Sequence, residues 1–570
     1  MIGYVCKYAP VELIRAFGGD AVRIEPHVTG TDTADALMHP NLCSYAKAVF
    51  EEVRQGDYEA LVLTTCCDSI RRLADAVNAH CPDTRVFVLD LPRESGRGAV
   101  ARYAKELSRL ADELQQLTGR SFERACLIEL LADAGKGHAA GEAPSGKPRV
   151  GIAGARHNTG SLERLLEDAG LEVAFDASCV GMRSDVRVRA ADLAELDFRG
   201  LMERYAAALL EQLPCMRMAD TSKRTEFFER ELAHVDGLVY HTVKFCDMYS
   251  FEYAELHAKA AVPILKIETD MTAQSSGQLK TRIEAFAESL RTEKGKAMPI
   301  SQKPKSTGSA RYALGIDSGS TSTNAVLVDA SGSILAHAVQ RTGARAADSA
   351  RRVYEQVLAQ AGRVAEDIDV VVSTGYGRVS LDFADFDITE ITCHAAGAHA
   401  LAPEVRTIID IGGQDSKAIR LDEAGEVVDF AMNDKCAAGT GRFLEAMART
   451  LEVQVDELGE LSSHARHKVE ITSMCTVFAE SEVISLIAKN VERADIAQGV
   501  HEAIAAKTTA LAQRVKPQGR YMMTGGVARN VGVVRALEER IGEPLIIADD
   551  PDIVGAYGAA LLGLRKLMGD

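Results

Sequence analysis

The sequence lacks the features that would assign the chain to a membrane or to export. It has no run of about 18 apolar residues, and its start has no basic segment, apolar stretch and cleavage site of an export signal. Positive charge is also in deficit, because 65 Lys and Arg face 82 Asp and Glu, a formal net charge of −17. Such a surface repels phosphate backbones and anionic lipids. We therefore expect a cytoplasmic protein without nucleic-acid or membrane partners.

The length of 570 residues exceeds what one hydrophobic core usually spans, so the chain is expected to contain several domains. Residues 291–312 are rich in Lys, Pro, Ser and Gly without apolar periodicity, which predicts a linker. On both sides, short apolar runs alternate with longer amphipathic stretches, the pattern of α/β domains with mostly parallel sheets. A weaker break near residues 136–147 divides the first half. The predicted domains are Rossmann-like lobes at 1–140 and 148–290 and a third domain at 313–568.

Six strands are predicted in the first half, and their order in a sheet is left open. They are Ala60–Thr64, Val86–Leu91, Val150–Ala153, Glu172–Phe175, Gly237–His241 and Ile264–Glu268. Ligands of open parallel sheets gather beyond the carboxyl ends of the strands. The position of a reactive side chain relative to its strand therefore indicates whether it can reach a site.

Cysteine is the informative residue of the first half, because thiols in a chain of this size serve metal or redox chemistry more often than disulfides. Six cysteines follow predicted strands or lie in loops where no thiol is needed to fill a core. They are Cys43, Cys66, Cys67, Cys179, Cys215 and Cys246. Together they favour a buried iron-sulfur site between the two lobes.

The remaining cysteines of the first half have other expected roles. Cys81 precedes its strand and Cys126 falls in an amphipathic helix, so both are expected to be structural. Cys6 is ambiguous, with packing favoured over a place at the site. No CxxC pair occurs anywhere, which excludes a compact zinc ribbon. Adjacent Cys66 and Cys67 are expected to diverge in extended backbone and to hold different irons, which hints at more than one cubane.

Several stretches of the first half, among them NLCSYAK, TTCCDSIRRL, FDASCVGMR and LPCMRM, resemble the 2-hydroxyacyl-CoA dehydratase component family. The doubled cysteine and the set of six thiols look more like the double-cubane cluster proteins within that family. This resemblance implies an 8Fe-9S double cubane, or a single 4Fe-4S cluster, in the N-terminal module. The implied ligands are Cys43, Cys66, Cys67, Cys179, Cys215 and Cys246.

The second half contains three glycine-rich turns after apolar strands, in Ala313–Asp329, Arg406–Ile419 and Tyr521–Asn530. Their order and spacing resemble the duplicated ATPase fold of acetate kinase, actin and Hsp70. Asp317 and Asp410 stand at two strand ends, where they are expected to serve MgATP catalysis, Asp317 by orienting hydrated Mg²⁺. The residues expected to bind the nucleotide are Gly315, Ser318, Gly319, Ser320, Thr321, Ser322, Gly412, Gly413, Gln414, Gly439, Gly441, Gly525, Gly526 and Asn530.

Two further cysteines, Cys436 and Cys475, are each expected at the N-terminus of a helix, where free N–H groups favour thiolates and anionic clusters. Two thiols are too few for a cubane, but a twofold dimer supplies four. CAAGTGRFLE and DIGGQDSK resemble the activators of 2-hydroxyacyl-CoA dehydratases and the ATPase subunits of benzoyl-CoA reductases. That resemblance implies a homodimer sharing one 4Fe-4S cluster through both cysteines, whereas Cys393 is expected only to pack.

The leading hypothesis is an ATP-dependent, low-potential iron-sulfur reductase. Ferredoxin or flavodoxin would supply an electron, MgATP hydrolysis would drive it into the N-terminal cluster, and a small molecule would be reduced. One alternative is a radical 2-hydroxyacyl-CoA dehydratase with a fused activator. Another is an ATP-gated redox sensor or scaffold whose first half binds a partner.

Overall fold

The computed structural model describes residues 1–39, 41–133, 146–158, 160–179, 186, 188–272, 276–292, 311–433, 437–472 and 476–568. Its contacts divide the chain into two units, Met1–Ile283 and Glu284–Asp570. The boundary lies within helix α11 (Ser276–Thr292), before the predicted linker, and residues 293–310 of that linker lie outside the described ranges. Within these ranges, no helix combines the length and apolar character needed to cross a bilayer.

The first lobe of unit 1 is a four-stranded parallel sheet in the order β2-β1-β3-β4. Strand β3 reads ALVLT and is buried throughout, as expected for a parallel strand covered on both faces. The strands are β1 (Ile2–Tyr4), β2 (Ala21–Arg23), β3 (Ala60–Thr64) and β4 (Arg85–Leu89). The helices are α1 (Val11–Ala16), α2 (Asp32–Leu37), α3 (Ser44–Gln55), α4 (Asp68–His80), α5 (Arg97–Thr118) and α6 (Arg124–Asp133).

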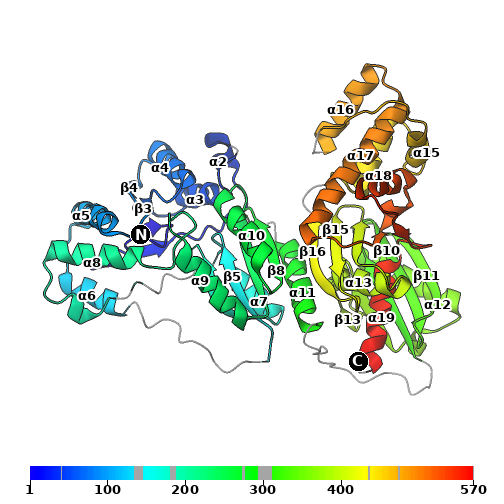
Figure 1. Cartoon of the computed structure of the whole chain (residues 1–570), viewed down its shortest axis with the longest axis horizontal. Coiled ribbons are helices and arrows are strands. Elements are labelled where there is room, and N and C mark those ends of the chain that lie inside the picture. The colour runs from blue at the N-terminus through cyan, green and yellow to red at the C-terminus, as the bar shows by residue number, and fades with distance from the viewer. Residues whose placement is uncertain are drawn as a thin grey trace. The chain divides into compact units, whose positions relative to one another are not determined.

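The second lobe of unit 1 repeats this strand order as β6-β5-β7-β8, again all parallel. Helices α5 and α8 pack against each other, and one continuous apolar core joins the two lobes. The strands are β5 (Arg149–Gly154), β6 (Glu172–Ser178), β7 (Gly237–Val243) and β8 (Ile264–Thr269). The helices are α7 (Ser161–Asp168), α8 (Phe198–Leu210), α9 (Ser222–Glu231), α10 (Asp247–Lys259) and the start of α11. All six predicted strands occur, and Figure 1 labels β3, β4, β5 and β8 among them.

Unit 2 contains two five-stranded sheets with one shared topology, β11-β10-β9-β12-β13 and β16-β15-β14-β17-β18. In each, an antiparallel three-stranded meander is extended by two parallel strands, which confirms the predicted duplicated ATPase fold. The first sheet comprises β9 (Tyr312–Ser318), β10 (Ser322–Asp329), β11 (Ile334–Arg341), β12 (Val370–Thr374) and β13 (Phe386–Asp387). The second comprises β14 (Thr407–Ile411), β15 (Ser416–Leu421), β16 (Val427–Asn433), β17 (Tyr521–Thr524) and β18 (Ile546–Ile547).

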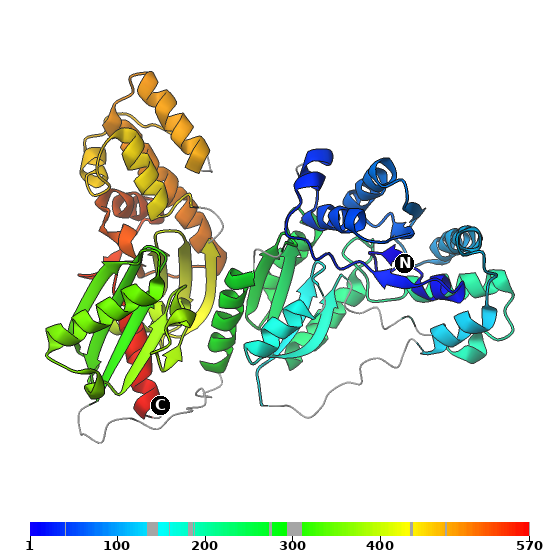
Figure 2. The ribbon, with the colours of Figure 1, turned by 180° about the vertical axis from the view of Figure 1, so that it is seen from behind.

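Alternating apolar residues of the strands in unit 2 bury both faces of each sheet. In the first sheet, Leu314 and Ile316 pack with helix α12, whereas Ala313 and Val326 pack with helix α19. The helices of unit 2 are α12 (Ala346–Ala361), α13 (Glu390–Leu401), α14 (Gly441–Leu451), α15 (Leu458–Ser463), α16 (Thr476–Ala488), α17 (Arg493–Ala512), α18 (Val531–Ile541) and α19 (Val554–Met568). Figure 2 shows the same sheets and their covering helices from behind.

Candidate functional sites

Unit 1 encloses a cavity of about 80 Å³, which we call the thiol cavity because cysteines from both lobes line it. It lies at the carboxyl ends of strands β1, β3, β6 and β7, where a parallel sheet usually binds its ligand. The lining thiols are Cys6, Cys43, Cys66, Cys67, Cys179, Cys215 and Cys246. The structure thus brings together all six predicted thiols of the first half and adds a seventh, Cys6.

Three of these cysteines stand at the N-caps of helices. Cys43 precedes α3, Cys67 precedes α4 and Cys246 precedes α10. Free backbone N–H groups and the positive end of the helix dipole stabilise a thiolate or an anionic cluster at such a position. The sequence predicts that helix N-termini stabilise thiolates at Cys436 and Cys475. The same stabilisation applies to these three cysteines of the thiol cavity.

The thiols of the cavity interact pairwise, and in each pair one member has the lower pKa. The pKa of Cys67 falls to about 6 through a hydrogen bond with Cys66 and the nearby charge of Arg217, despite burial. The pKa values of Cys215 and Cys246 are lowered by their thiol partners, Cys179 and Cys43. The cavity can therefore supply several thiolates, the form in which cysteine binds a metal.

Basic and phenolic side chains complete the lining of the thiol cavity. Although burial opposes it, the charges of Cys67 and Cys246 raise the pKa of Arg217. Burial lowers the pKa of Lys7. The hydroxyl of Tyr249 lies 3.3 Å from the sulfur of Cys215. Sequence reasoning missed these three residues, although Lys7, Arg217 and Tyr249 each lie within three positions of a lining cysteine.

One expectation about the cysteines is wrong, and the ambiguous case of Cys6 takes both of its possible roles. Cys66 and Cys67 do not diverge, because the strand ends at Thr64 and the two thiols hydrogen-bond each other in the following turn. Cys6 is buried as expected for a packing residue, but it also lines the cavity and hydrogen-bonds Cys66. Cys81 and Cys126 are absent from the cavity lining, in agreement with their expected structural roles.

Unit 2 contains a larger cavity of about 710 Å³, the nucleotide cavity, formed where its two sheets present their hairpin turns. Asp317 and Asp410 are the penultimate residues of β9 and β14, and both carboxylates line the cavity. The predicted binding residues that also line it are Gly319, Ser320, Thr321, Ser322, Gly412, Gly413, Gly441, Gly525, Gly526 and Asn530. Backbone N–H groups and hydroxyls at such turns suit phosphate oxygens.

A buried cluster of charges surrounds Lys417 in the nucleotide cavity. Its ammonium lies 2.5 Å from Asp415, 3.1 Å from Asp410 and 3.4 Å from Glu390. Burial would raise the pKa of Asp410, but His394 and Lys417 outweigh it and lower that pKa to about 2. Burial raises the pKa of Glu390 to about 8. Asp410 is therefore ionised and available to a cation, while Glu390 holds its proton near neutral pH.

His394 lies between the two predicted catalytic carboxylates. Its Nε2 is 3.9 Å from Asp317 and its Nδ1 is 3.8 Å from Asp410. The Thr524 hydroxyl donates to Asp410 at 2.9 Å and lies 3.2 Å from Nδ1, so it can accept a hydrogen bond from that nitrogen. Sequence reasoning missed His394 and Glu390, because only the fold brings α13 beside the two strand ends. It also missed Lys417, although Lys417 pairs with Asp410 in the hairpin of β14 and β15.

Four predicted nucleotide-binding residues do not line the nucleotide cavity: Gly315, Ser318, Gln414 and Gly439. A Cβ on Gly315 would lie 2.0 Å from the carbonyl oxygen of Ala556, so glycine is needed there for close packing against α19. Ser318 is fully buried beneath the turn. Gly439, with φ +90°, lines a separate cavity beside Lys507.

Cys436 and Cys475, the predicted ligands of the shared cluster, lie outside the described residues. Helix α16 begins at Thr476, directly after Cys475 in the sequence. Helix α14 begins only at Gly441, later than expected, because Gly439 adopts a left-handed conformation and Thr440 forms the N-cap. Cys393 is buried in the core between α13 and α19, as expected for a packing residue.

The two halves of the chain match two different protein families. Residues 6–140 and 124–290 match the 2-hydroxyglutaryl-CoA dehydratase, D-component family, and residues 314–563 match the BadF/BadG/BcrA/BcrD ATPase family. The chain therefore belongs to the dehydratase D-component family over its first half and to the BadF/BadG/BcrA/BcrD ATPase family over its second half. One polypeptide thus joins a dehydratase component module to an activator-type ATPase.

Individual relatives cover the second half. The 2-hydroxyisocaproyl-CoA dehydratase activator of Clostridioides difficile is 46% identical over 250 residues, which are 44% of this chain and 94% of that protein. A benzoyl-CoA reductase component of Thauera aromatica is 38% identical over 38% of this chain and 78% of its own length. The crystal structure of component A of (R)-2-hydroxyglutaryl-CoA dehydratase from Acidaminococcus fermentans is 44% identical, with a TM-score of 0.44, over 45% of this chain and 99% of that one.

Proposed function

We propose that this protein is an ATP-dependent iron-sulfur reductase in which unit 2 drives electrons at low potential into unit 1. The strongest support for this proposal is the thiol cavity, where seven cysteines meet in the same chain as an activator-type ATPase. Because both modules lie in one chain, their ratio is fixed and their effective concentration is high. This favours an electron donor and an electron acceptor that serve only each other.

The thiol cavity fits an iron-sulfur group. Its donors are soft thiols, three of them at helix N-caps, and Arg217 supplies positive charge that offsets thiolates. We propose Cys43, Cys66, Cys67, Cys179, Cys215 and Cys246 as ligands of an 8Fe-9S double cubane or a 4Fe-4S cluster. Such a group would accept and release single electrons at low potential. Around it, Tyr249 would donate a hydrogen bond to the Cys215 sulfur and orient it.

The nucleotide cavity fits MgATP. Ionised Asp410, together with Asp317, would hold hydrated Mg²⁺, and the turns with Gly412, Gly413 and Gly525 would face the phosphates. Lys417 offsets the negative charge of the carboxylates of Asp410 and Asp415, and the protonated Glu390 lies beside it. Loss of the γ-phosphate would then change the charge balance at both hairpin turns at once.

We further propose a homodimer that shares one 4Fe-4S cluster through Cys436 and Cys475 of each chain, reduced by ferredoxin or flavodoxin. Lowering a one-electron potential by about 250 mV costs about 6 kcal/mol, within reach of one or two ATP hydrolyses. Hydrolysis can contribute this energy only if ATP binds the electron-donating conformation better than the resting one.

A second candidate is a 2-hydroxyacyl-CoA dehydratase with a fused activator, favoured by the family match of unit 1. The two candidates differ in their iron content. A double cubane plus half of a shared cubane predicts about ten irons per chain, whereas one cubane plus half predicts about six.

The test is iron and acid-labile sulfide per chain on protein purified without oxygen, followed by ATP-dependent reduction of its absorbance band. About ten irons and bleaching that requires ATP are expected for the reductase. Protein that is colourless and metal-poor yet hydrolyses ATP would contradict it. ATP hydrolysis with bound iron but no reducible substrate would instead favour a sensor.

A further inference from the structure

The two sheets of unit 2 place the same two residue types side by side, an aspartate and a threonine. In the first sheet, Asp317 of β9 lies in register with Thr374 of β12, and in the second, Asp410 of β14 lies in register with Thr524 of β17. Both threonines are the last residues of their strands and are fully buried. Register partners on neighbouring strands project their side chains on the same face of a sheet. Each hydroxyl therefore lies on the same face as its carboxylate.

Among the residues that the structure describes, only the second pair is joined by a hydrogen bond. The Thr524 hydroxyl donates to Oδ1 of Asp410 at 2.9 Å, whereas the Thr374 hydroxyl makes no hydrogen bond to Asp317. The second pair also has a histidine beside it, because Nδ1 of His394 lies 3.2 Å from the Thr524 oxygen. The two threonines therefore form a comparison within one chain.

The directions of these hydrogen bonds follow from the chemistry of the hydroxyl. A threonine hydroxyl carries a single hydrogen, and that of Thr524 is donated to Asp410. Toward His394 the same oxygen can therefore only accept, which places a hydrogen on Nδ1. Without this donor, the hydroxyl is free to rotate about its C–O bond and to leave the carboxylate. His394 thus fixes the orientation in which Thr524 binds Asp410.

The second oxygen of Asp410 is held as well. Nζ of Lys417 lies 3.1 Å from Oδ2 of Asp410 and 3.4 Å from Glu390. Glu390 and His394 are four residues apart in α13, so they lie on one face of this helix. That face acts on both oxygens of Asp410, on one through Lys417 and on the other through Thr524. Each oxygen keeps a further lone pair for a cation.

Helix α19 limits the movement of the His394 ring. His394 is only 4% exposed, and its Nε2 lies 3.9 Å from Asp317, beyond hydrogen-bond distance. A Cβ on Gly555, in the first turn of α19, would lie 2.9 Å from this nitrogen and 2.6 Å from Oδ2 of Asp317. The backbone of α19 therefore closes the space behind the ring, which keeps Nδ1 directed at Thr524.

We propose that His394 is a positioning residue for ATP hydrolysis, which acts through Thr524 to hold the Asp410 carboxylate in the orientation that binds hydrated Mg²⁺. The proposal rests on the MgATP site of the proposed function. In this role His394 affects the reaction only through Asp410. Loss of the Nδ1–H donor frees the Thr524 hydroxyl, so the site binds Mg²⁺ less well and hydrolyses ATP more slowly.

The first test makes the same substitution in both sheets. Thr524→Val removes the hydroxyl between His394 and Asp410 and should lower kcat for ATP hydrolysis about 10–100-fold, the effect of losing a hydrogen bond to a charged group. The Mg²⁺ concentration that gives half the maximal rate should rise about tenfold. Thr374→Val is the matched control and should stay within about twofold of wild type in both quantities. Equal effects of the two substitutions would overturn the proposal.

A serine variant separates loss of the hydroxyl from loss of packing. Thr524→Ser keeps the hydroxyl but lacks the methyl group, whereas Thr524→Val keeps the shape and lacks the hydroxyl. The serine variant should therefore be at least about tenfold more active than the valine variant. The reverse order would show that Thr524 serves packing alone and would overturn the proposal.

The second test restores a donor at one ring nitrogen at a time. The amide of His394→Asn can donate from the position of Nδ1, whereas that of His394→Gln reaches the position of Nε2. The asparagine variant should therefore be at least about tenfold more active than the glutamine variant. A residue that only fills space would favour glutamine, which is closer to histidine in volume. Equal or greater activity of His394→Gln would contradict the role of Nδ1.

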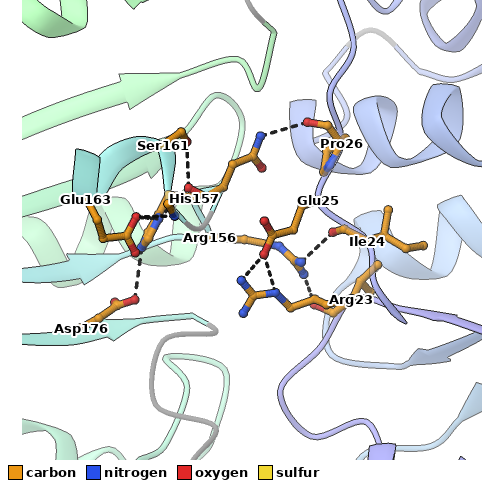
Figure 3. A network of polar contacts seen from close by, with 12 residues as sticks. Arg23, Ile24, Glu25, Pro26, Arg156, His157, Ser161, Glu163 and Asp176 are labelled. Carbon is orange, nitrogen blue, oxygen red and sulfur yellow. Dashed lines mark hydrogen bonds and ion pairs between the residues drawn. The ribbon is translucent and has the colours of Figure 1, made fainter. Parts of the chain in front are cut away.

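A buried histidine of unit 1 provides the control for the histidine variants. His157 is also 4% exposed and also lies beside two carboxylates, those of Asp176 and Glu163 (Figure 3). His157→Asn should leave ATP hydrolysis within about twofold of wild type, because the nucleotide cavity lies in unit 2. A loss of ATP hydrolysis as large as that of His394→Gln would show that any buried histidine has this effect, and would overturn the proposal.

Binding of Mn²⁺ separates this proposal from the proposed function. In full-length protein with ADP, the Kd for Mn²⁺, read from the electron paramagnetic resonance signal of the free ion, should rise about tenfold in Thr524→Val but not in Thr374→Val. This measurement needs neither hydrolysis nor electron transfer, so it decides the role of Thr524 and His394 even if the wild type is no reductase. Equal Mn²⁺ affinities would overturn the positioning role alone. A wild type that binds no Mn²⁺ with ADP would overturn the MgATP site as well.

Discussion

The thiol cavity and the nucleotide cavity are built alike but lined differently. Each lies at strand ends of a pair of sheets that repeat one topology. The first has a volume of about 80 Å³ and gathers sulfur, whereas the second has about 710 Å³ and gathers carboxylates and glycines. The same architecture thus serves soft and hard ligands, and the residues at the strand ends decide which.

The two cavities also balance buried charge in different ways. The thiol cavity shares protons between neighbouring sulfurs and uses helix N-caps and Arg217. The nucleotide cavity places Lys417 beside the carboxylates of Asp410 and Asp415 and keeps a proton on Glu390. A variant in one cavity should therefore leave the chemistry of the other unchanged, which the following predictions test.

The largest effect is expected in the thiol cavity. Cys66→Ser and Cys67→Ser should each remove a comparable, major share of the iron bound by unit 1, because a serine hydroxyl does not replace a thiolate ligand. ATP hydrolysis by unit 2 should persist. Iron, sulfide and phosphate release are measured on the same preparations. Cys126→Ser in helix α6 is the control and should retain its iron, whereas full iron content in both test variants would contradict the ligand assignment.

The next largest effect is expected in the nucleotide cavity. Asp410→Asn should lower kcat for ATP hydrolysis about 10²–10³-fold, because it removes an ionised carboxylate from the proposed Mg²⁺ site. The iron of the thiol cavity should not change. Asp348→Asn, whose carboxylate is 54% exposed in helix α12, serves as the control. Equal kcat values for the two variants would show that Asp410 does not take part in ATP hydrolysis.

Much of both cavities could be predicted from the sequence because their residues follow strands. The apolar run before Cys66 and the glycine-rich turn after Asp317 place both residues at strand ends from the sequence alone. The distinction between binding and packing glycines could not be predicted. Gly315 resembles its neighbours in sequence, and only the approach of α19 shows that it is a packing residue.

One partner of Lys417 was unpredictable for a related reason. Asp410 and Asp415 lie in the same β14–β15 hairpin as Lys417, but Glu390 comes from helix α13, and no local pattern joins that helix to strand β15. Strand order was equally out of reach, since pairing between parallel strands depends on contacts distant in sequence.

A smaller effect should distinguish a packed glycine from an open one. Gly315→Ala places a Cβ 2.0 Å from the backbone of α19 and should cost about 1–3 kcal/mol of unfolding free energy. Gly98→Ala in helix α5 of unit 1 meets only the end of Arg102, at 3.9 Å, and should be neutral or stabilising. Thermal unfolding of both variants measures the difference, and equal midpoints would contradict the packing argument.

The smallest effect concerns the proton on Glu390. Its pKa is about 8 in the folded protein against 4.5 ordinarily, so folding retains a proton that the unfolded chain releases. Stability should therefore fall as pH rises from about 4.5 to about 8, and Glu390→Gln should make this dependence shallower. Thermal midpoints of wild type and variant across that range provide the measurement. A steeper dependence in the variant would show that the carboxyl is ionised.

The helix N-caps at the thiol cavity bear on the direction of electron flow. Three helix dipoles, at roughly 0.3–1 kcal/mol each, would stabilise an added negative charge by about 1–3 kcal/mol, or about 40–130 mV. Under the proposed function, a cluster held by Cys43, Cys67 and Cys246 would retain an added electron more strongly than the same cluster without these helix N-caps. Back-transfer would be correspondingly slower, so spent nucleotide could leave before the electron is lost.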